Sequence, residues 1–273
     1  MNRPNGAIAV TNRIDDIFTK QRAEDRRGLM PFVCGGHPAT DSLPGVLRGL
    51  EAGGASIVEV GIPFSDPIAD GPVIASAMHG ALQAGVTPET AFEQVASVRS
   101  ELSIGLVAMV SVSLVEGMGG PENFCERAAR AGFDGLIVPD CPLEEANRVR
   151  EAASASGLTA SLLVAPTTPR ERAAEIARAC TGFVYLVARA GVTGARRSAP
   201  NVAPMTEAIR AATDLPIACG FGISTPEHVA AVVEHADAAI VGSALVKHLG
   251  ETHDQNGDVA AAAEDYTRRL ASG

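Results

Sequence analysis

The sequence predicts a single-domain α/β protein, residues 1–273, folded as a (β/α)8 TIM barrel with an extra N-terminal helix. Three observations support this fold. Eight apolar runs alternate with segments rich in Ala, Arg and Glu, and this βα alternation favours parallel strands joined by right-handed crossovers. The runs are almost entirely apolar, as in a parallel sheet that is buried on both faces. Eight such units in 273 residues fit a closed barrel better than an open sheet.

Strands are expected where the apolar runs lie. In chain order they are residues 29–34, 56–60, 104–110, 134–139, 159–165, 182–188, 215–220 and 237–242. The segments between them predict helices over 41–53, 88–100, 121–132, 142–157, 169–180, 202–213 and 226–236. Further helices are expected over 12–27, before the first strand, and from about 258 to the end. Residues 250–258, GETHDQNGD, are polar and predict a surface loop.

Local signals mark several helix ends. The pairs Thr168–Pro169 and Thr225–Pro226 each place an N-cap residue before a proline at the first helical position. Gly132 and Gly157 stand where a glycine just past the last turn would end a helix. These signals place the helix ends between the predicted strands, as a barrel of alternating strands and helices requires.

Composition narrows the classes of function. The formal net charge of −10 disfavours nucleic acid and anionic membranes as partners. No apolar run approaches the ~20 residues of a membrane span, and the first residues lack the apolar core of a secretory signal, so a cytoplasmic location is expected. The five cysteines form no CxxC pair, and His228 and His235 do not have i, i+4 spacing. We therefore expect no metal site.

Acidic residues cluster at the end of the second strand, in SIVEVGIPFSDPIADGP (56–72). Chemistry in such barrels takes place at the C-terminal ends of the strands. Burial would raise the pKa of Glu59 and suit it to proton transfer, whereas Asp70, on a loop, should stay ionised more easily. The pattern is equally compatible with a buried ion pair between Glu59 and an arginine, and with Asp66 and Asp70 as turn formers.

Glycine-rich turns follow the last three strands. Two of them, CGFGIST (219–225) and VGSALVK (241–247), lie where barrels of this kind bind phosphate. Glycine admits a close approach to the backbone and helix N-termini supply N–H donors, so the expected phosphate cradle is Gly220, Gly222, Gly242 and Ser243. Residues 188–200, rich in Gly and Arg, are either a lid over a ligand or a solvated surface loop.

Six stretches carry a family resemblance. They are VEVGIPFSDPIADGP (58–72), DGLIVPDCP (134–142), LLVAPTTPRERAAEIA (162–177), FVYLVARAGVTGAR (183–196), ACGFGISTPEHV (218–229) and IVGSALVK (240–247). In this order, over nearly the whole chain, they resemble the tryptophan synthase alpha chain family. The resemblance implies a carbon–carbon lyase of L-tryptophan biosynthesis, which cleaves indole-3-glycerol phosphate to indole and glyceraldehyde 3-phosphate by a retro-aldol reaction.

The resemblance also implies roles for individual residues. It gives Glu59 the general acid/base role and places Asp70 beside the indole N–H, where its charge stabilises a cationic intermediate. Thr193 would hold Asp70 when the 188–200 loop closes. The substrate-binding residues that it implies, aromatic side chains for the indole ring and glycine turns for the phosphate among them, are Phe32, Tyr185, Thr193, Gly194, Phe221, Gly222, Gly242 and Ser243.

The resemblance implies no cofactor for this step, but it does imply a partner. The partner is a tryptophan synthase beta chain, a pyridoxal phosphate enzyme, in an alpha2-beta2 assembly. It would dock on the face that carries the loops, where it would contact the Asp66 loop and the 188–200 lid.

Two regions depart from the family pattern. Members usually carry a Tyr-x-Asn stretch after strand three, whereas this chain reads AMVSVSLVEGMGGPENF (108–124). His37 stands where an acid is common, and we interpret it as a surface-loop histidine without a catalytic role. The altered segment leaves open a stand-alone indole-3-glycerol phosphate lyase that works without a beta chain.

Two more distant alternatives are also open. The first is a non-catalytic phosphate-binding barrel that only docks the beta chain. The second is another phosphate-binding isomerase or aldolase. An aldolase would use a lysine at a strand end, but Lys20 and Lys247, the only lysines in the chain, are both expected on helices.

Overall fold

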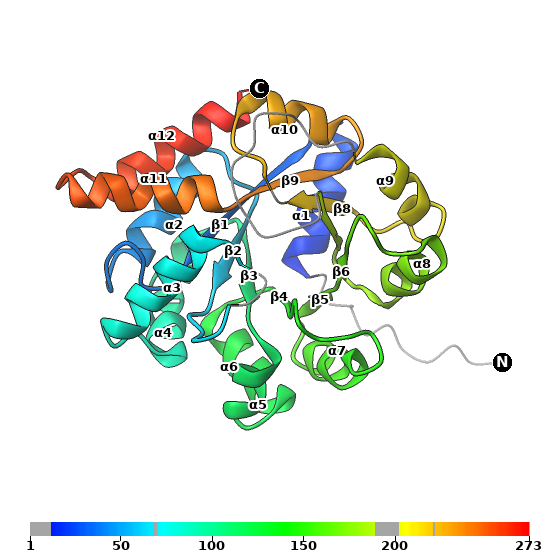
Figure 1. The fold of residues 1–273 in the computed structure, drawn as a ribbon, viewed down its shortest axis with the longest axis horizontal. Coiled ribbons are helices and arrows are strands. Elements are labelled where there is room, and N and C mark those ends of the chain that lie inside the picture. Colours follow the sequence, from blue (N-terminus) through cyan, green and yellow to red (C-terminus); the bar gives the residue numbers. More distant parts are fainter. Residues whose placement is uncertain (1–11, 68–69, 189–201, 221, 273) are drawn as a thin grey trace.

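The computed structural model describes residues 12–67, 70–188, 202–220 and 222–272, which form a parallel barrel surrounded by helices (Figure 1). Nine strands follow the order β5-β4-β3-β2-β1-β9-β8-β7-β6, and every pairing is parallel. The strands are β1 Gly28–Cys34, β2 Ile57–Gly61, β3 Gly105–Met109, β4 Gly135–Ile137, β5 Thr159–Ser161, β6 Leu163–Val164, β7 Val184–Val187, β8 Ile217–Gly220 and β9 Ala238–Val241. The predicted barrel is confirmed.

The fifth predicted strand, residues 159–165, is divided in two at Leu162. Strand β5 pairs with β4, and strand β6 pairs with β7. At the junction, the Leu162 N–H donates to Cys180 Sγ over 3.3 Å, and the Leu162 carbonyl accepts from the Tyr185 N–H over 3.2 Å. The hydrogen-bonding partner therefore changes at a single residue, and here the barrel passes from its first half to its second.

Helices cover the outside of the barrel, and one more precedes it. They are α1 Arg13–Ala23, α2 Leu43–Ala52, α3 Pro72–Gln83, α4 Pro88–Val98, α5 Val112–Gly117, α6 Pro121–Ala131, α7 Ala146–Ala155, α8 Arg170–Ala179, α9 Ala203–Arg210, α10 Pro226–Val233, α11 Ser243–Asp254 and α12 Val259–Ala271. Among the described residues, no helix is both long and apolar enough to cross a lipid bilayer.

Two predictions about helix ends were wrong. Residues 250–254 are not loop, because α11 continues to Asp254; Leu245, Val246 and Leu249 bury one face of it while its polar residues occupy the other. Thr168 does not cap α8, since Pro169 occupies the N-cap position and the Thr168 hydroxyl accepts from the Ala165 N–H instead.

The other end signals are confirmed. Thr225 caps α10 by accepting from the His228 N–H. Gly132 follows α6 with a left-handed φ of 96°, and Gly157 follows α7 with a φ of 74°. A side chain would be strained at both glycines.

Helix α1 closes the N-terminal end of the barrel. Its buried residues Ile14 and Phe18 belong to the cluster that fills the barrel lumen, and the Phe18 ring lies 6.0 Å from the Phe183 ring. Glycines at the strand starts make room for it, because a Cβ at Gly135 would lie 2.9 Å from Ile14 Cδ1. The lumen below the strand ends is therefore packed with side chains.

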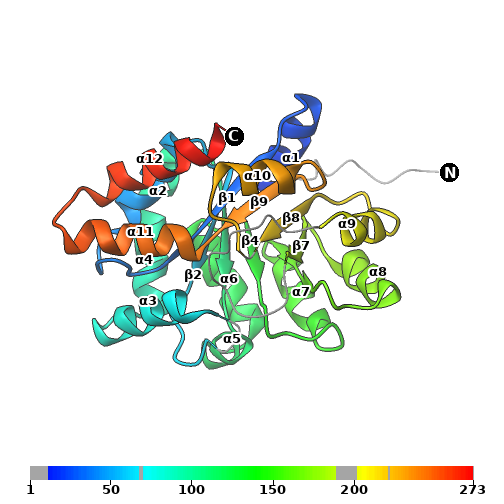
Figure 2. The same ribbon diagram turned by 45° about the horizontal axis from the view of Figure 1, so that its top comes forward.

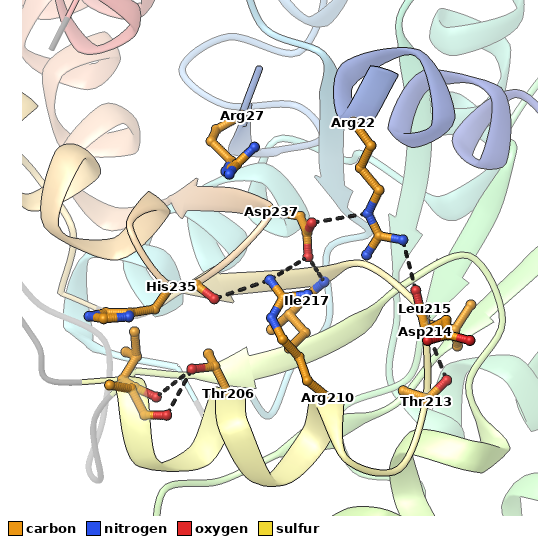
Figure 3. Close-up of polar contacts among 12 residues, drawn as sticks. Arg22, Arg27, Thr206, Arg210, Thr213, Asp214, Leu215, Ile217, His235 and Asp237 are labelled. Carbon is orange, nitrogen blue, oxygen red and sulfur yellow. Dashed lines mark hydrogen bonds and ion pairs between the residues drawn. The ribbon is translucent and has the colours of Figure 1, made fainter. Parts of the chain in front are cut away.

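A buried carboxylate holds α1 to the barrel (Figure 3). Asp237, just before β9, accepts from the Arg22 and Arg210 side chains at 3.1 Å each and from the Ile217 N–H at 2.9 Å. Burial opposes its charge, but the bonds from Arg22 and Ile217 and the charge of Arg210 outweigh it and keep the pKa of Asp237 below its usual range. This network ties α1, α9, β8 and β9 together at the end opposite the glycine turns.

Helices α2 and α12 pack with almost no side chain between them. Gly45, Gly49 and Gly53 are spaced four residues apart and so share one face of α2 and its C-cap. A Cβ at Gly53 would lie 2.5 Å from the Glu264 carbonyl oxygen of α12, and one at Gly49 would overlap the Ala260 carbonyl oxygen. The glycines thus let two helix backbones approach as closely as they do.

Gly49→Ala should lower the free energy of unfolding by about 1–3 kcal/mol, because the new methyl group meets backbone that cannot rotate away. Gly80→Ala is the matched control, since no heavy atom lies within 4 Å of the Cβ it would add to α3. Alanine there should be neutral or stabilising by about 0.5–1 kcal/mol. Urea unfolding of both variants measures the difference, and equal effects would contradict the packing described here.

Candidate active site

A cavity opens at the C-terminal ends of the strands, with a volume of about 960 Å³ including its mouth. Its walls come from both halves of the barrel, including strands β1, β2 and β7 and the turns after β2, β3, β4, β8 and β9. Seven of the ten predicted catalytic and substrate-binding residues line it, namely Phe32, Glu59, Asp70, Tyr185, Gly222, Gly242 and Ser243, and Asp66 lines it as well. The structure thus brings together in one space most of the site residues predicted from separate strand ends.

Glu59 points into the barrel. Its neighbours Val58 and Val60 belong to the outer cluster, while Ile57 belongs to the lumen cluster, so Glu59 shares the inward face with Ile57. It is fully buried, and neither carboxylate oxygen has a hydrogen-bond partner within the described part of the chain. Burial alone raises the pKa of Glu59 well above its usual range. The alternative of a buried ion pair with an arginine finds no partner among the described residues, which do not include Arg189, Arg196 and Arg197.

Asp70 approaches the cavity from the loop between β2 and α3. It is less exposed than the sequence analysis expected, and burial raises its pKa to about 6. Asp66, on the same loop, is exposed and accepts from the Ser65 hydroxyl. The three acids therefore lie in different environments: Glu59 is in the lumen, Asp70 is at the cavity wall, and Asp66 is at the surface.

The inner wall of the cavity is apolar. A Cβ at Gly61 would lie 2.5 Å from Phe32 Cζ, so the glycine that ends β2 is what lets the Phe32 ring lie across it. Burial raises the pKa of Tyr185, with the charge of Glu59 as the next cause, so the phenol stays neutral beside the carboxyl group. The sequence analysis did not predict several apolar residues that line the cavity, namely Ile62, Phe64, Ile74, Met78, Met109, Leu163 and Ile240. The apolar periodicity of α3 and of the strands is the signal that could have identified them.

Part of the cavity wall presents backbone. Gly242 is the N-cap of α11 and Ser243 is its first residue, so the first N–H groups of this helix have no acceptor within the helix. Gly222 has a left-handed φ of 80°. Gly220, predicted for the cradle, does not line the cavity; its Cβ would lie 2.7 Å from the Tyr185 hydroxyl, so glycine is required there for packing. Thr193, Gly194, Phe221 and residues 189–200 of the predicted lid lie outside the described residues.

The comparisons with known proteins identify the family. A family model for the tryptophan synthase alpha chain matches residues 18–273. The chain belongs to the tryptophan synthase alpha chain family. An alpha chain from Synechococcus sp. (strain CC9902) is 46% identical over 255 residues, covering 93% of this chain and 94% of the relative. One from Solibacter usitatus is 42% identical over 265 residues, covering 96% and 97%.

Solved structures of the family have the same fold. The alpha subunit from Legionella pneumophila superposes with a TM-score of 0.88 at 32% identity, covering 96% of this chain and 98% of that one. A chain of tryptophan synthase from Mycobacterium tuberculosis gives 0.86 at 33% identity, covering 96% and 98%. The barrel and its loops therefore correspond to the family over nearly their whole length.

The segment that departs from the family pattern, 108–124, forms part of the cavity wall. After β3 the chain enters the short helix α5, which Ser111 caps by accepting from the Leu114 N–H. The Val112 N–H donates to the Asp140 carboxylate over 2.9 Å, and both Ser111 and Asp140 line the cavity. Ser111, in the segment that departs from the family pattern, thus lies next to Asp140 at the same wall of the cavity.

His37 is not the simple surface residue that the sequence analysis expected. It is partly buried, and its Nε2 lies 3.0 Å from the Val246 carbonyl of α11. Burial lowers its pKa, which favours the neutral ring with Nε2–H donating to that carbonyl. His37 is not among the residues that line the cavity.

Glu59→Gln should raise the free energy of unfolding at pH 7 by about 1–3 kcal/mol. The pKa of Glu59 is raised in the folded state, so folding opposes ionisation, and this penalty grows as the pH rises above the unfolded pKa of about 4.3. Glutamine does not ionise, so the variant does not carry this penalty. Denaturant unfolding at pH 7 and at pH 4.5 checks this, because the gain should shrink at the lower pH. An unchanged or lower stability at pH 7 would mean that Glu59 has a partner.

Proposed function

We propose that this chain cleaves indole-3-glycerol phosphate to indole and glyceraldehyde 3-phosphate, as the alpha chain of a tryptophan synthase. One observation carries the proposal. Glu59, a buried carboxyl group with no hydrogen-bond partner among the described residues, lines the same cavity as an apolar wall and two turns that present backbone. A substrate with a flat apolar ring, a reactive carbon and a phosphate matches these three features.

The reaction needs two proton movements. The indole carbon that bears the side chain gains a proton, and the hydroxyl on the adjacent side-chain carbon loses one. The bond between the two carbons then breaks, its electrons return to the indole ring, and the hydroxyl carbon becomes the aldehyde of glyceraldehyde 3-phosphate. Glu59 is the group that moves protons, since its raised pKa keeps a proton available near neutral pH.

Asp70 supplies the charge that the intermediate needs. Protonating the indole ring makes it cationic, and a carboxylate near the ring N–H stabilises that cation more than it stabilises the neutral substrate. With a pKa of about 6, Asp70 is mostly ionised at pH 7, despite its burial. Thr193 is the residue proposed to hold Asp70 when the 188–200 loop closes.

The rest of the cavity binds the substrate. Phe32 and Tyr185 contact the indole ring, and the first N–H groups of α11 with those of the Gly222 turn bind the phosphate. Gly194 and Phe221 complete the site by resemblance to the family. Lysine chemistry has no place here, because Lys20 is on α1 at the far end of the barrel and Lys247 pairs with Glu251 on the exposed side of α11.

A tryptophan synthase beta chain, which carries pyridoxal phosphate, is the proposed partner in an alpha2-beta2 assembly. The exposed Asp66 lies on the loop at the cavity mouth, where a docked chain would receive indole. The altered 108–124 wall leaves open a second candidate, a lyase that needs no partner. Adding a beta chain separates them: a large rise in indole release indicates coupling, and high release without it indicates a stand-alone enzyme.

Glu59→Gln should lower the rate of indole release by about 10²–10⁴-fold, because it removes the proton-transfer group and keeps its shape. Affinity for glycerol 3-phosphate should stay nearly unchanged, which shows that the cavity is intact. The assay is indole formation from indole-3-glycerol phosphate, with and without a beta chain. Turnover within a few-fold of wild type would remove Glu59 from the mechanism, and no release by wild type in either condition would favour the non-catalytic barrel.

The kcat/KM for indole release should fall as the pH drops through about 6, since protonated Asp70 no longer stabilises the cation. Asp70→Asn should lower activity about 10²–10³-fold at pH 7.5. In this variant the fall in kcat/KM near pH 6, the acid limb of the pH profile, should disappear. The substrate phosphate also titrates near pH 6. A limb that persists unchanged in the variant therefore belongs to the phosphate and not to Asp70.

A further inference from the structure

Tyr266 lies on the outer helix α12, outside the cavity. Helix α12 runs beside α11 and reaches α10 near its C-terminal end (Figures 1 and 2). The Tyr266 side chain is partly buried and packs against both hydrophobic clusters that surround the barrel. It therefore lies where these two clusters meet.

The first contact of Tyr266 is with α11. Its ring lies 5.1 Å from the His248 ring, with 30° between the two planes. His248 is five residues after Ser243, the first residue of the helix. Arg269, on the same helix as Tyr266, places its guanidinium carbon 5.3 Å from the centre of the Tyr266 ring and further restricts it.

The second contact is with the turn between β8 and α10. The Tyr266 hydroxyl donates to the Ser224 carbonyl over 3.4 Å. Ser224 directly follows Gly222 and Ile223, both of which line the cavity, and precedes Thr225, which caps α10. The hydroxyl thus holds the backbone two residues from Gly222.

We propose that Tyr266 is a positioning residue for the phosphate cradle: it fixes the Gly222 turn relative to the N-terminus of α11 without touching the ligand. The inference rests on the proposed function, in which these two backbone segments bind the phosphate. Donors on separate segments bind one phosphate well only when their spacing is held, and side chains behind the contact residues provide that support. Tyr266 is suited to this because its ring contacts one segment and its hydroxyl the other.

Tyr266→Phe separates positioning from packing. Phenylalanine keeps the ring against His248 and Arg269 and removes only the bond to the Ser224 carbonyl. At 3.4 Å this bond is long, so we expect a modest effect: a roughly threefold to tenfold weaker affinity for glycerol 3-phosphate. Affinity for indole, which occupies the apolar part, should not change. With indole-3-glycerol phosphate, KM should rise by a similar factor while kcat stays near wild type.

Asp265→Asn is the matched control, because Asp265 is the exposed neighbour of Tyr266 on α12 and only pairs with Arg268. It should leave both ligand affinities unchanged. Calorimetric titration of glycerol 3-phosphate and of indole into wild type and both variants gives the comparison. Equal glycerol 3-phosphate affinities for wild type and Tyr266→Phe, or parallel losses for both ligands, would overturn the inference alone. No binding of glycerol 3-phosphate by wild type would overturn the proposed phosphate site and the inference with it.

Discussion

The burial of Glu59, which has no hydrogen-bond partner among the described residues, is the constraint on which the rest of the site depends. Water would hydrate Glu59 and return its pKa to normal, so the lumen beneath it has to be filled. Helix α1 does this from below, with Phe18 against Phe183, and the Arg22–Asp237 pair keeps the helix in place. The ion pair at one end of the barrel thus helps to keep water away from the buried carboxyl group at the other end.

Two acids on one strand and its loop acquire different properties because their surroundings differ. Glu59 lies among lumen side chains, whereas Asp70 lies at the wall of an open cavity. The same short segment can therefore hold a protonated acid and a carboxylate near neutral pH. Phe32, in register with Glu59 on the neighbouring strand, links this pair to the apolar wall. The pairing of the strands, and not the conformation of any one loop, therefore determines how these side chains lie relative to one another.

The sequence predicted the strands well because each is buried on both faces and so reads as a continuous apolar run. Local patterns could not predict features that depend on a distant neighbour. Leu162 divides a strand because its partners lie on different strands, and the polar residues 250–254 are helical because the other face of α11 is buried. His37 and Gly220 were misread for the same reason: Val246 and Tyr185, which explain them, are far away in the chain. Glu59 was recognisable because a lone acid among apolar β-formers is itself a local anomaly.

The glycine face of α2 has a consequence for the order in which the protein is made. Helix α2 ends at Ala52 and its partner α12 begins at Val259, so about 200 residues of chain separate the two surfaces. On the ribosome, α2 is complete long before α12 exists, and its bare backbone face has nothing to pack against. The glycine face of α2 therefore stays uncovered until a segment about 200 residues later has been synthesised. Packing of this early helix depends in this way on a part of the chain that is made much later.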